Sequence, residues 1–101
     1  MRLAVDSREP AVFVRRLVLE PGEAMPWHTD PCRWLSVVVS GERLDIEYRS
    51  TGVSVPVQVK PGMAEWDNPE PAEYRGINAG SVPYEVVVVF FLRRRGPIPS
   101  R

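Results

Sequence analysis

This chain of 101 residues contains only one histidine and one cysteine. It also has no net charge, because its 13 basic residues balance 13 acidic ones. The single cysteine, Cys32, excludes an intrachain disulfide, and a reducing cytoplasm is the expected compartment. A net charge of zero provides neither the basic surface of a nucleic-acid-binding domain nor a general attraction to anionic membranes. We therefore expect a cytoplasmic protein with no nucleic-acid partner and no membrane partner.

Long apolar runs and helical periodicity are also missing. The longest apolar run, Val86 to Leu92, is far shorter than the roughly 20 residues of a membrane-spanning helix. The first ten residues contain no apolar stretch of secretory length. No segment has the i, i+3, i+4, i+7 apolar spacing of an amphipathic helix.

Short β-strands between turns are what the chain does contain. Eleven prolines and seven glycines divide it into β-branched or alternating segments, which is typical of a β-sandwich or barrel. We predict an all-β jelly-roll barrel of about eight or more strands, with little or no helix. The expected strands cover residues 11–20, 35–40, 43–48, 53–59, 63–67, 72–78 and 84–93. Residues 1–9 form an N-terminal arm or strand, residues 10–93 a single barrel domain, and residues 94–101 a C-terminal tail.

Two of these strands carry further information. Pro56 points outward in the alternating segment 53–59 and predicts an edge strand or a bulge, because proline cannot donate to a ladder. The last strand is apolar on both faces from Val86 to Leu92, so both faces need cover. One face can fill the barrel, and for the other we predict a homodimer, with cover from within the chain as the alternative.

From residue 22 onward, the spacing of turn residues and polar residues resembles the cupin superfamily. The first cupin motif, G-x5-H-x-H-x3-E-x6-G, is matched in position by Gly22, His28, Asp30, Trp34 and Gly41. The second motif, P-x-G-x2-H-x3-N, is matched in position by Pro69, Pro71, Tyr74 and Asn78. The resemblance spans roughly residues 10–93 and implies the double-stranded β-helix of cupins.

The same resemblance places the metal-ligand positions of a cupin at His28, Asp30, Trp34 and Tyr74. Only His28 is the usual residue, and an indole such as Trp34 cannot bind a metal. Because His28 is the only histidine, one subunit can build neither a two-histidine, one-carboxylate iron site nor a three-histidine zinc site. We expect no standard cupin metal site, and a divalent metal held by His28 and Asp30 is the alternative.

The candidate site residues lie around the expected barrel interior. The residues predicted to bind a ligand are His28, Asp30, Trp34, Glu65, Trp66 and Tyr74. His28 and Tyr74 are also the candidate catalytic pair, since an imidazole and a phenol can exchange protons with a substrate. The structural alternatives are a buried polar pair of His28 and Asp30, core filling by Trp34 and a Tyr74 hydroxyl that only satisfies a neighbour.

Three classes of function follow, and the residues leave open whether the protein is an enzyme. The first is a small-molecule-binding cupin without a standard metal site. The second is an enzyme: an isomerase or epimerase with His28 and Tyr74 as acid and base across the pocket, or a dioxygenase-like enzyme with a variant metal shell. The third is a structural or protein-interaction module.

Overall fold

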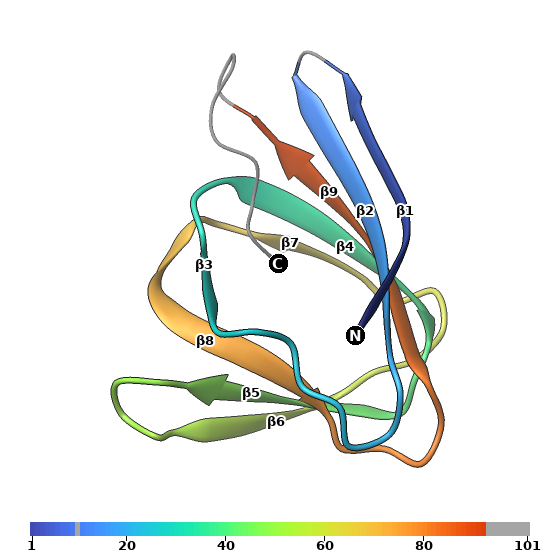
Figure 1. Ribbon diagram of the computed structural model, residues 1–101, viewed down its shortest axis with the longest axis vertical. Helices are drawn as coiled ribbons and strands as arrows, with labels where there is room; N and C mark the ends of the chain where they lie inside the picture. The colour runs from blue at the N-terminus through green and yellow to red at the C-terminus, as the bar shows by residue number, and fades with distance from the viewer. Residues whose placement is uncertain (10, 93–101) are drawn as a thin grey trace.

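The computed structural model describes residues 1–9 and 11–92, which form nine β-strands and no helix. The strands make two antiparallel sheets that face each other across a central space (Figure 1). In spatial order, the larger sheet contains β1 (Arg2–Glu9), β2 (Val12–Leu19), β9 (Tyr84–Phe91), β4 (Arg33–Ser40) and β7 (Ala64–Asp67). The smaller sheet contains β3 (His28–Asp30), β8 (Glu70–Asn78), β5 (Arg43–Tyr48) and β6 (Ser54–Gln58).

Glycine allows the chain to turn where the sheets connect. Gly22 and Gly62 each follow a proline and have φ near +86°, a left-handed conformation that favours glycine. Gly41 has a φ of 140°, and a Cβ atom there would lie 2.9 Å from the Tyr84 ring. The glycines at positions 22 and 41 of the first motif are therefore required by backbone geometry.

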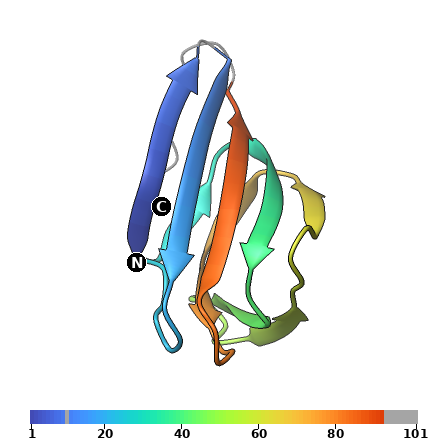
Figure 2. The same cartoon turned by 90° about the vertical axis from the view of Figure 1, so that its right-hand side faces the viewer.

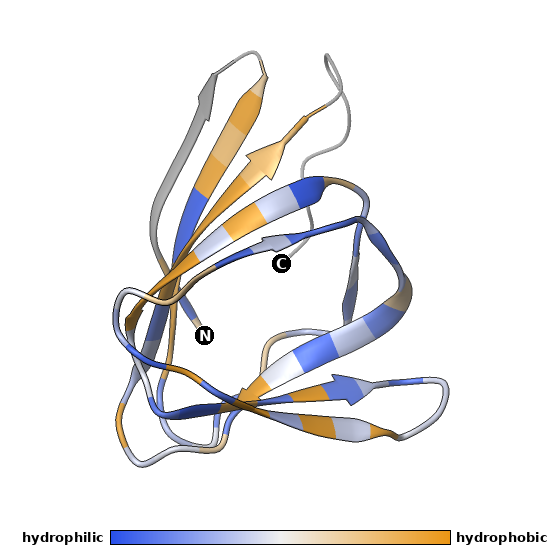
Figure 3. Ribbon diagram, turned by 180° about the vertical axis from the view of Figure 1, so that it is seen from behind, coloured by the Kyte–Doolittle hydropathy of each residue, from blue (hydrophilic) through white to orange (hydrophobic). Residues whose placement is uncertain are grey.

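Alternate residues of the larger sheet point between the sheets and form the core. On the central strand β9, Val86, Val88 and Phe90 are almost completely buried, while Val87 and Val89 on the opposite face are half-buried. Apolar residues are concentrated along β2, β9 and β4 (Figure 3). The barrel interior therefore has one strongly apolar wall.

The opposite face of the larger sheet has an apolar surface of its own. Figure 2 shows β1, β2, β9 and β4 side by side on this side of the molecule. We call this surface the outer apolar face; its half-buried or exposed residues are Val12, Val14, Leu35, Val37, Val39, Trp66, Val87, Val89 and Phe91. Trp66 and Phe91 stack with ring centroids 5.4 Å apart.

The strand predictions agree with the structure over most of the chain. The segment 43–48 is a strand as predicted, and β6, which contains Pro56, is one of the two edge strands of the smaller sheet. The prediction missed the three-residue strand β3 inside a polar, proline-containing segment. It also began β8 two residues late, because the structure continues this strand through Pro71 where a bend was expected.

The structure describes the first of the two predicted terminal segments and not the second. Residues 1–9 contain a full strand, β1, which pairs with β2. The predicted tail, 94–101, lies outside the described residues. No helix long and apolar enough to cross a lipid bilayer occurs in the part of the chain that the structure describes.

Candidate functional site

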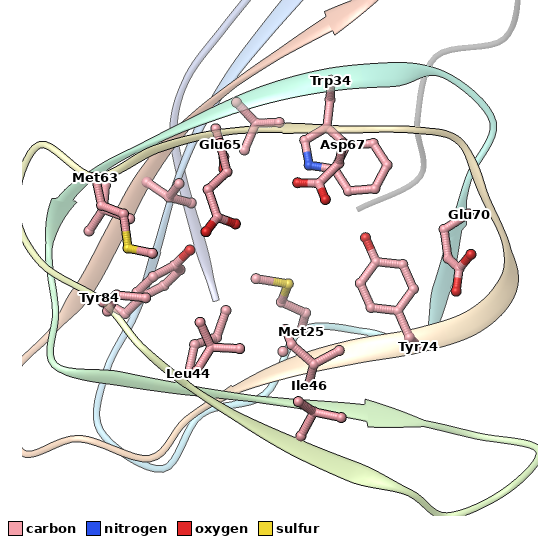
Figure 4. A pocket seen from close by; sticks show the side chains of 18 of the residues that line it. Met25, Trp34, Leu44, Ile46, Met63, Glu65, Asp67, Glu70, Tyr74 and Tyr84 are labelled. Atoms are coloured by element: carbon pink, nitrogen blue, oxygen red, sulfur yellow. The ribbon is translucent and has the colours of Figure 1, made fainter.

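A cavity of about 420 Å³ lies between the two sheets. Most of its wall is apolar, and its polar groups come from a few side chains (Figure 4). The apolar and aromatic lining consists of Met25, Trp34, Val38, Leu44, Ile46, Tyr48, Val55, Val57, Val59, Met63, Tyr74, Tyr84, Val86 and Val88. This volume is within the range of small-molecule pockets, toward its lower end.

The cavity opens between two edge strands, one from each sheet. Its most exposed lining residues are Val55 on β6, Glu65 on β7 and Asn68 just after β7. Strands β6 and β7 are the outermost strands of different sheets and do not pair with each other. The exposed lining residues along these two unpaired edges therefore mark an entrance to the cavity.

Two carboxylates reach the cavity from β7 because of its pairing with β4. Glu65 lies opposite Ser36, and Asp67 lies opposite Trp34. All four residues line the cavity, and both carboxylates point into it (Figure 4). A third carboxylate, that of Glu70 at the start of β8, also lines it.

Tyr74 connects the cavity wall to a buried polar group. Its hydroxyl donates a hydrogen bond to Oδ2 of Asp30, and its ring centroid lies 4.5 Å from that of His28. The pairing of β3 with β8 explains this contact, since His28 lies opposite Tyr74. Asp30 and His28 are buried, with 1% and 3% of their surfaces exposed, and neither lines the cavity, whereas Tyr74 does.

The proton arrangement of His28 follows from its neighbours. Nδ1 lies 2.7 Å from the carbonyl oxygen of Pro26, and because a carbonyl only accepts, Nδ1 must carry a proton. Nε2 lies 3.7 Å from Oδ2 of Asp30. The imidazole is thus held by β3 and its preceding loop, and it contacts the cavity wall through the Tyr74 ring.

The residues at the cupin ligand positions do not fit a metal ion. Trp34 offers no ligand atom, and Oδ2 of Asp30 already accepts the Tyr74 hydroxyl. Within residues 1–9 and 11–92, no group of three or more His, Cys, Asp or Glu side chains is placed to hold a metal. The donor set is therefore poorer than the three protein ligands that catalytic metal sites use.

Cys32 lies near Asp30, and its thiol has low reactivity. It is buried, and burial, with the nearby charge of Asp30, raises the pKa of its thiol above the ordinary value of 9.0. The thiolate is the reactive form of cysteine. Cys32 is therefore a structural residue and adds no nucleophile to the site.

The structure brings together five of the six predicted ligand-binding residues and corrects the sixth. Trp34, Glu65 and Tyr74 line the cavity, and His28 and Asp30 lie behind Tyr74. Trp66 does not: it is 58% exposed on the outer apolar face, with the Arg33 guanidinium 5.0 Å from its ring centroid. Adjacent residues of a strand point to opposite faces, so Glu65 and Trp66 cannot both reach the interior.

The same alternation also indicates a lining residue that was not among the predicted ones. Asp67 is two positions after Glu65 and shares its face of the strand. Glu70 carried no comparable signal, because it lies next to prolines in a segment expected to bend. The predicted acid/base pair also changes: His28 and Tyr74 are neighbours on the same side of the cavity and do not face each other across it.

Comparison with known proteins gives matches to solved structures only. No protein-family model and no curated protein sequence matches the chain. A cupin domain from Bordetella pertussis Tohama I superposes with a TM-score of 0.74 at 22% identity, over 91% of both chains. The chain has the cupin fold.

Other solved structures support the same fold without indicating a single activity. An uncharacterised conserved protein with a double-stranded β-helix domain from Klebsiella pneumoniae gives a TM-score of 0.68 at 17% identity, over 98% of this chain and 81% of that one. Oxalate oxidase gives a TM-score of 0.63 at 23% identity, and 44% of its chain is covered. At these identities the cupin fold is what is shared, and function must be argued from the site.

Proposed function

We propose that this cupin binds a small organic molecule in the cavity between its sheets, without a standard cupin metal site. The observation that carries the proposal is the cavity itself: an apolar interior with the Tyr74 hydroxyl and the Glu65, Asp67 and Glu70 side chains at its polar positions. Apolar walls with a few placed polar groups are the usual composition of a ligand site. Trp34 adds an aromatic wall where cupins place a metal ligand.

A cavity-filling variant tests this proposal. Ser36 lines the cavity and is half-buried, so Ser36→Phe should occupy the space meant for a ligand. Ser54→Phe, on an exposed position of β6 outside the cavity, is the matched control. A fragment screen by thermal shift, run with a metal chelator present, should give hits that stabilise the wild type and Ser54→Phe but not Ser36→Phe.

Two results would contradict it. The first is a set of hits that stabilise Ser36→Phe as strongly as the wild type, because the ligands would then bind elsewhere. The second is stabilisation that disappears in chelator and returns with a divalent metal, since binding would then depend on a metal site.

Acid–base catalysis is the second candidate, favoured by the hydrogen bond from Tyr74 to Asp30. A phenol at the cavity wall with a carboxylate behind it can move a proton to or from a bound molecule. An isomerase or epimerase would exchange a carbon-bound proton of its ligand with deuterated water. Tyr74→Phe should abolish that exchange, and exchange that continues at the wild-type rate would exclude this role.

We also propose that the protein is a cytoplasmic homodimer joined through the outer apolar face. A buried, unreactive cysteine suits a reducing compartment, and a contiguous apolar surface on β2, β9 and β4 suits a subunit interface. Cell fractionation tests the location. The molecular mass of the protein in solution tests the dimer.

A further inference from the structure

Two carboxylates at the cavity lack any ionic partner in the described part of the chain. Neither Glu65 nor Glu70 forms a side-chain hydrogen bond or ion pair there. By contrast, the Glu73 carboxylate pairs with Arg49 at 3.2 Å and that of Glu47 with Arg75 at 3.0 Å. Glu65 and Glu70 therefore differ from these surface glutamates in both position and pairing.

The cavity lining has a formal charge of one sign. Glu65, Asp67 and Glu70 are acidic, and the described lining residues include no lysine, arginine or histidine. Low-dielectric walls focus the field of charges that line a cleft, so the local concentration of cations rises and that of anions falls. A carboxylate or phosphate ligand would have to enter against this field.

Aromatic rings at the same cavity also favour a cationic ligand. The lining includes the rings of Trp34 and Tyr74, and the face of an aromatic ring attracts an organic cation. Trp34 lies opposite Asp67 on the neighbouring strand, so a ring and a carboxylate are adjacent on one wall. Figure 4 shows the Glu65 and Asp67 carboxylates and the Tyr74 hydroxyl pointing into one space.

The apolar part of the cavity wall indicates that the rest of the ligand is apolar. Met25, Leu44, Val86 and Val88 are buried lining residues of the interior, and burying apolar ligand surface against them favours binding. Glu65, by contrast, is exposed at the entrance between β6 and β7. The geometry points to an amphipathic organic amine whose ammonium group lies near the acidic entrance and whose apolar body lies inside.

This inference rests on the proposed function and names the ligand class of the same cavity. A matched series tests it, in which the cyclohexyl ring is constant and the polar group is cationic, neutral or anionic: cyclohexylmethylamine, cyclohexylmethanol and cyclohexanecarboxylate. Protein-observed NMR titrations should show the amine binding most tightly and the carboxylate most weakly. Added salt should weaken amine binding and leave alcohol binding unchanged.

Variants assign the effect to the two glutamates. Glu65→Gln and Glu70→Gln should each weaken amine binding about two- to fivefold, the range of a solvent-accessible ion pair, with alcohol binding unchanged. Glu73→Gln, which removes a paired carboxylate from outside the cavity, is the control and should change neither.

The outcomes separate this inference from the proposed function. If the alcohol or the carboxylate binds as tightly as the amine at cavity residues, the inference is wrong and small-molecule binding stands. If none of the three binds at about 10 mM, the inference is wrong, and the Ser36→Phe fragment screen then decides the proposed function separately.

Discussion

The hydroxyl of Tyr74 donates a hydrogen bond to Oδ2 of Asp30, a residue 44 positions earlier in the chain. This contact joins β8 to the short strand β3 inside the barrel. Asp30 is 1% exposed, so water cannot easily replace a lost partner. The hydrogen bond between Tyr74 and Asp30 therefore stabilises the fold and holds the Tyr74 ring at the cavity wall.

Tyr74→Phe should reduce the free energy of unfolding by about 1.5–3 kcal/mol, because a buried charged group loses a hydrogen bond while the ring is retained. Urea denaturation followed by tryptophan fluorescence measures the change. Tyr48→Phe is the matched control, since Tyr48 also lines the cavity and its ring lies 6.0 Å from that of Tyr74. Equal losses in the two variants would show that the Asp30 hydrogen bond is not the cause.

Asn78 fixes the turns of the barrel from the inside. Its Nδ2 donates to the carbonyl oxygens of Leu19 and Val82, and its Oδ1 accepts from the backbone N–H of Gly80. Asn78→Asp keeps the shape but replaces the donor with an oxygen that faces two carbonyls. We expect a loss of about 2–4 kcal/mol in the free energy of unfolding, since buried acceptors lose their donor and a charge is buried.

The control for Asn78 is chemically identical. Asn68→Asp makes the same change at an exposed position at the cavity entrance, where the expected effect is within about 0.5 kcal/mol. Urea midpoints of both variants give the comparison. Similar midpoints would mean that the hydrogen bonds of Asn78 do not hold the turns.

Most of the fold could be predicted because it depends on local patterns. Alternation placed strand 43–48, and Pro56 indicated an edge that the structure places at β6. The short strand β3 could not be predicted this way. Three residues are too few to show a period, and they form a strand only because β8 lies beside them.

The site was harder to predict, because register between distant strands decides it. The sequence indicated that His28, Asp30 and Tyr74 point inward. It could not show that Tyr74 lies opposite His28, or that a register shift follows between His28 and Asp30. That arrangement leaves Tyr74 at the cavity wall and the other two residues behind it. The error at Trp66 was of another kind, since alternation along β7 already excluded it.

Cys32 should be nearly unreactive in the native protein. Its pKa is raised by burial and by Asp30, so the neutral thiol predominates at neutral pH. Because the folded state holds this proton more tightly than the unfolded state, the associated stability is fully present below pH 9 and is lost as the pH rises above it. Iodoacetamide labelling followed by mass spectrometry should be slow at pH 7 and fast after unfolding in urea.

Cys32 is the only cysteine, so any labelling reports on it directly. Cys32→Ala is the matched variant: it should take up no label, and its stability should fall less steeply above pH 9 than that of the wild type. Rapid labelling of the native wild type at pH 7 would contradict the structural role and would indicate an accessible thiolate.

The outer apolar face predicts that the protein is a dimer in solution. Val87, Val89 and Phe91 point outward from the central strand β9, and a face of this kind is stable in water when a second copy covers it. Light scattering coupled to size-exclusion chromatography should give twice the 11.4 kDa mass of one chain.

Val89→Lys should convert the dimer to a monomer, because each subunit of a two-fold interface would bury a new charge. Val53→Lys, at an exposed position between β5 and β6, makes the same change away from this face and should remain dimeric. Circular dichroism of both variants checks that the strands are retained. A wild-type protein that is monomeric at about 100 μM would show that the outer apolar face has no second copy as its partner.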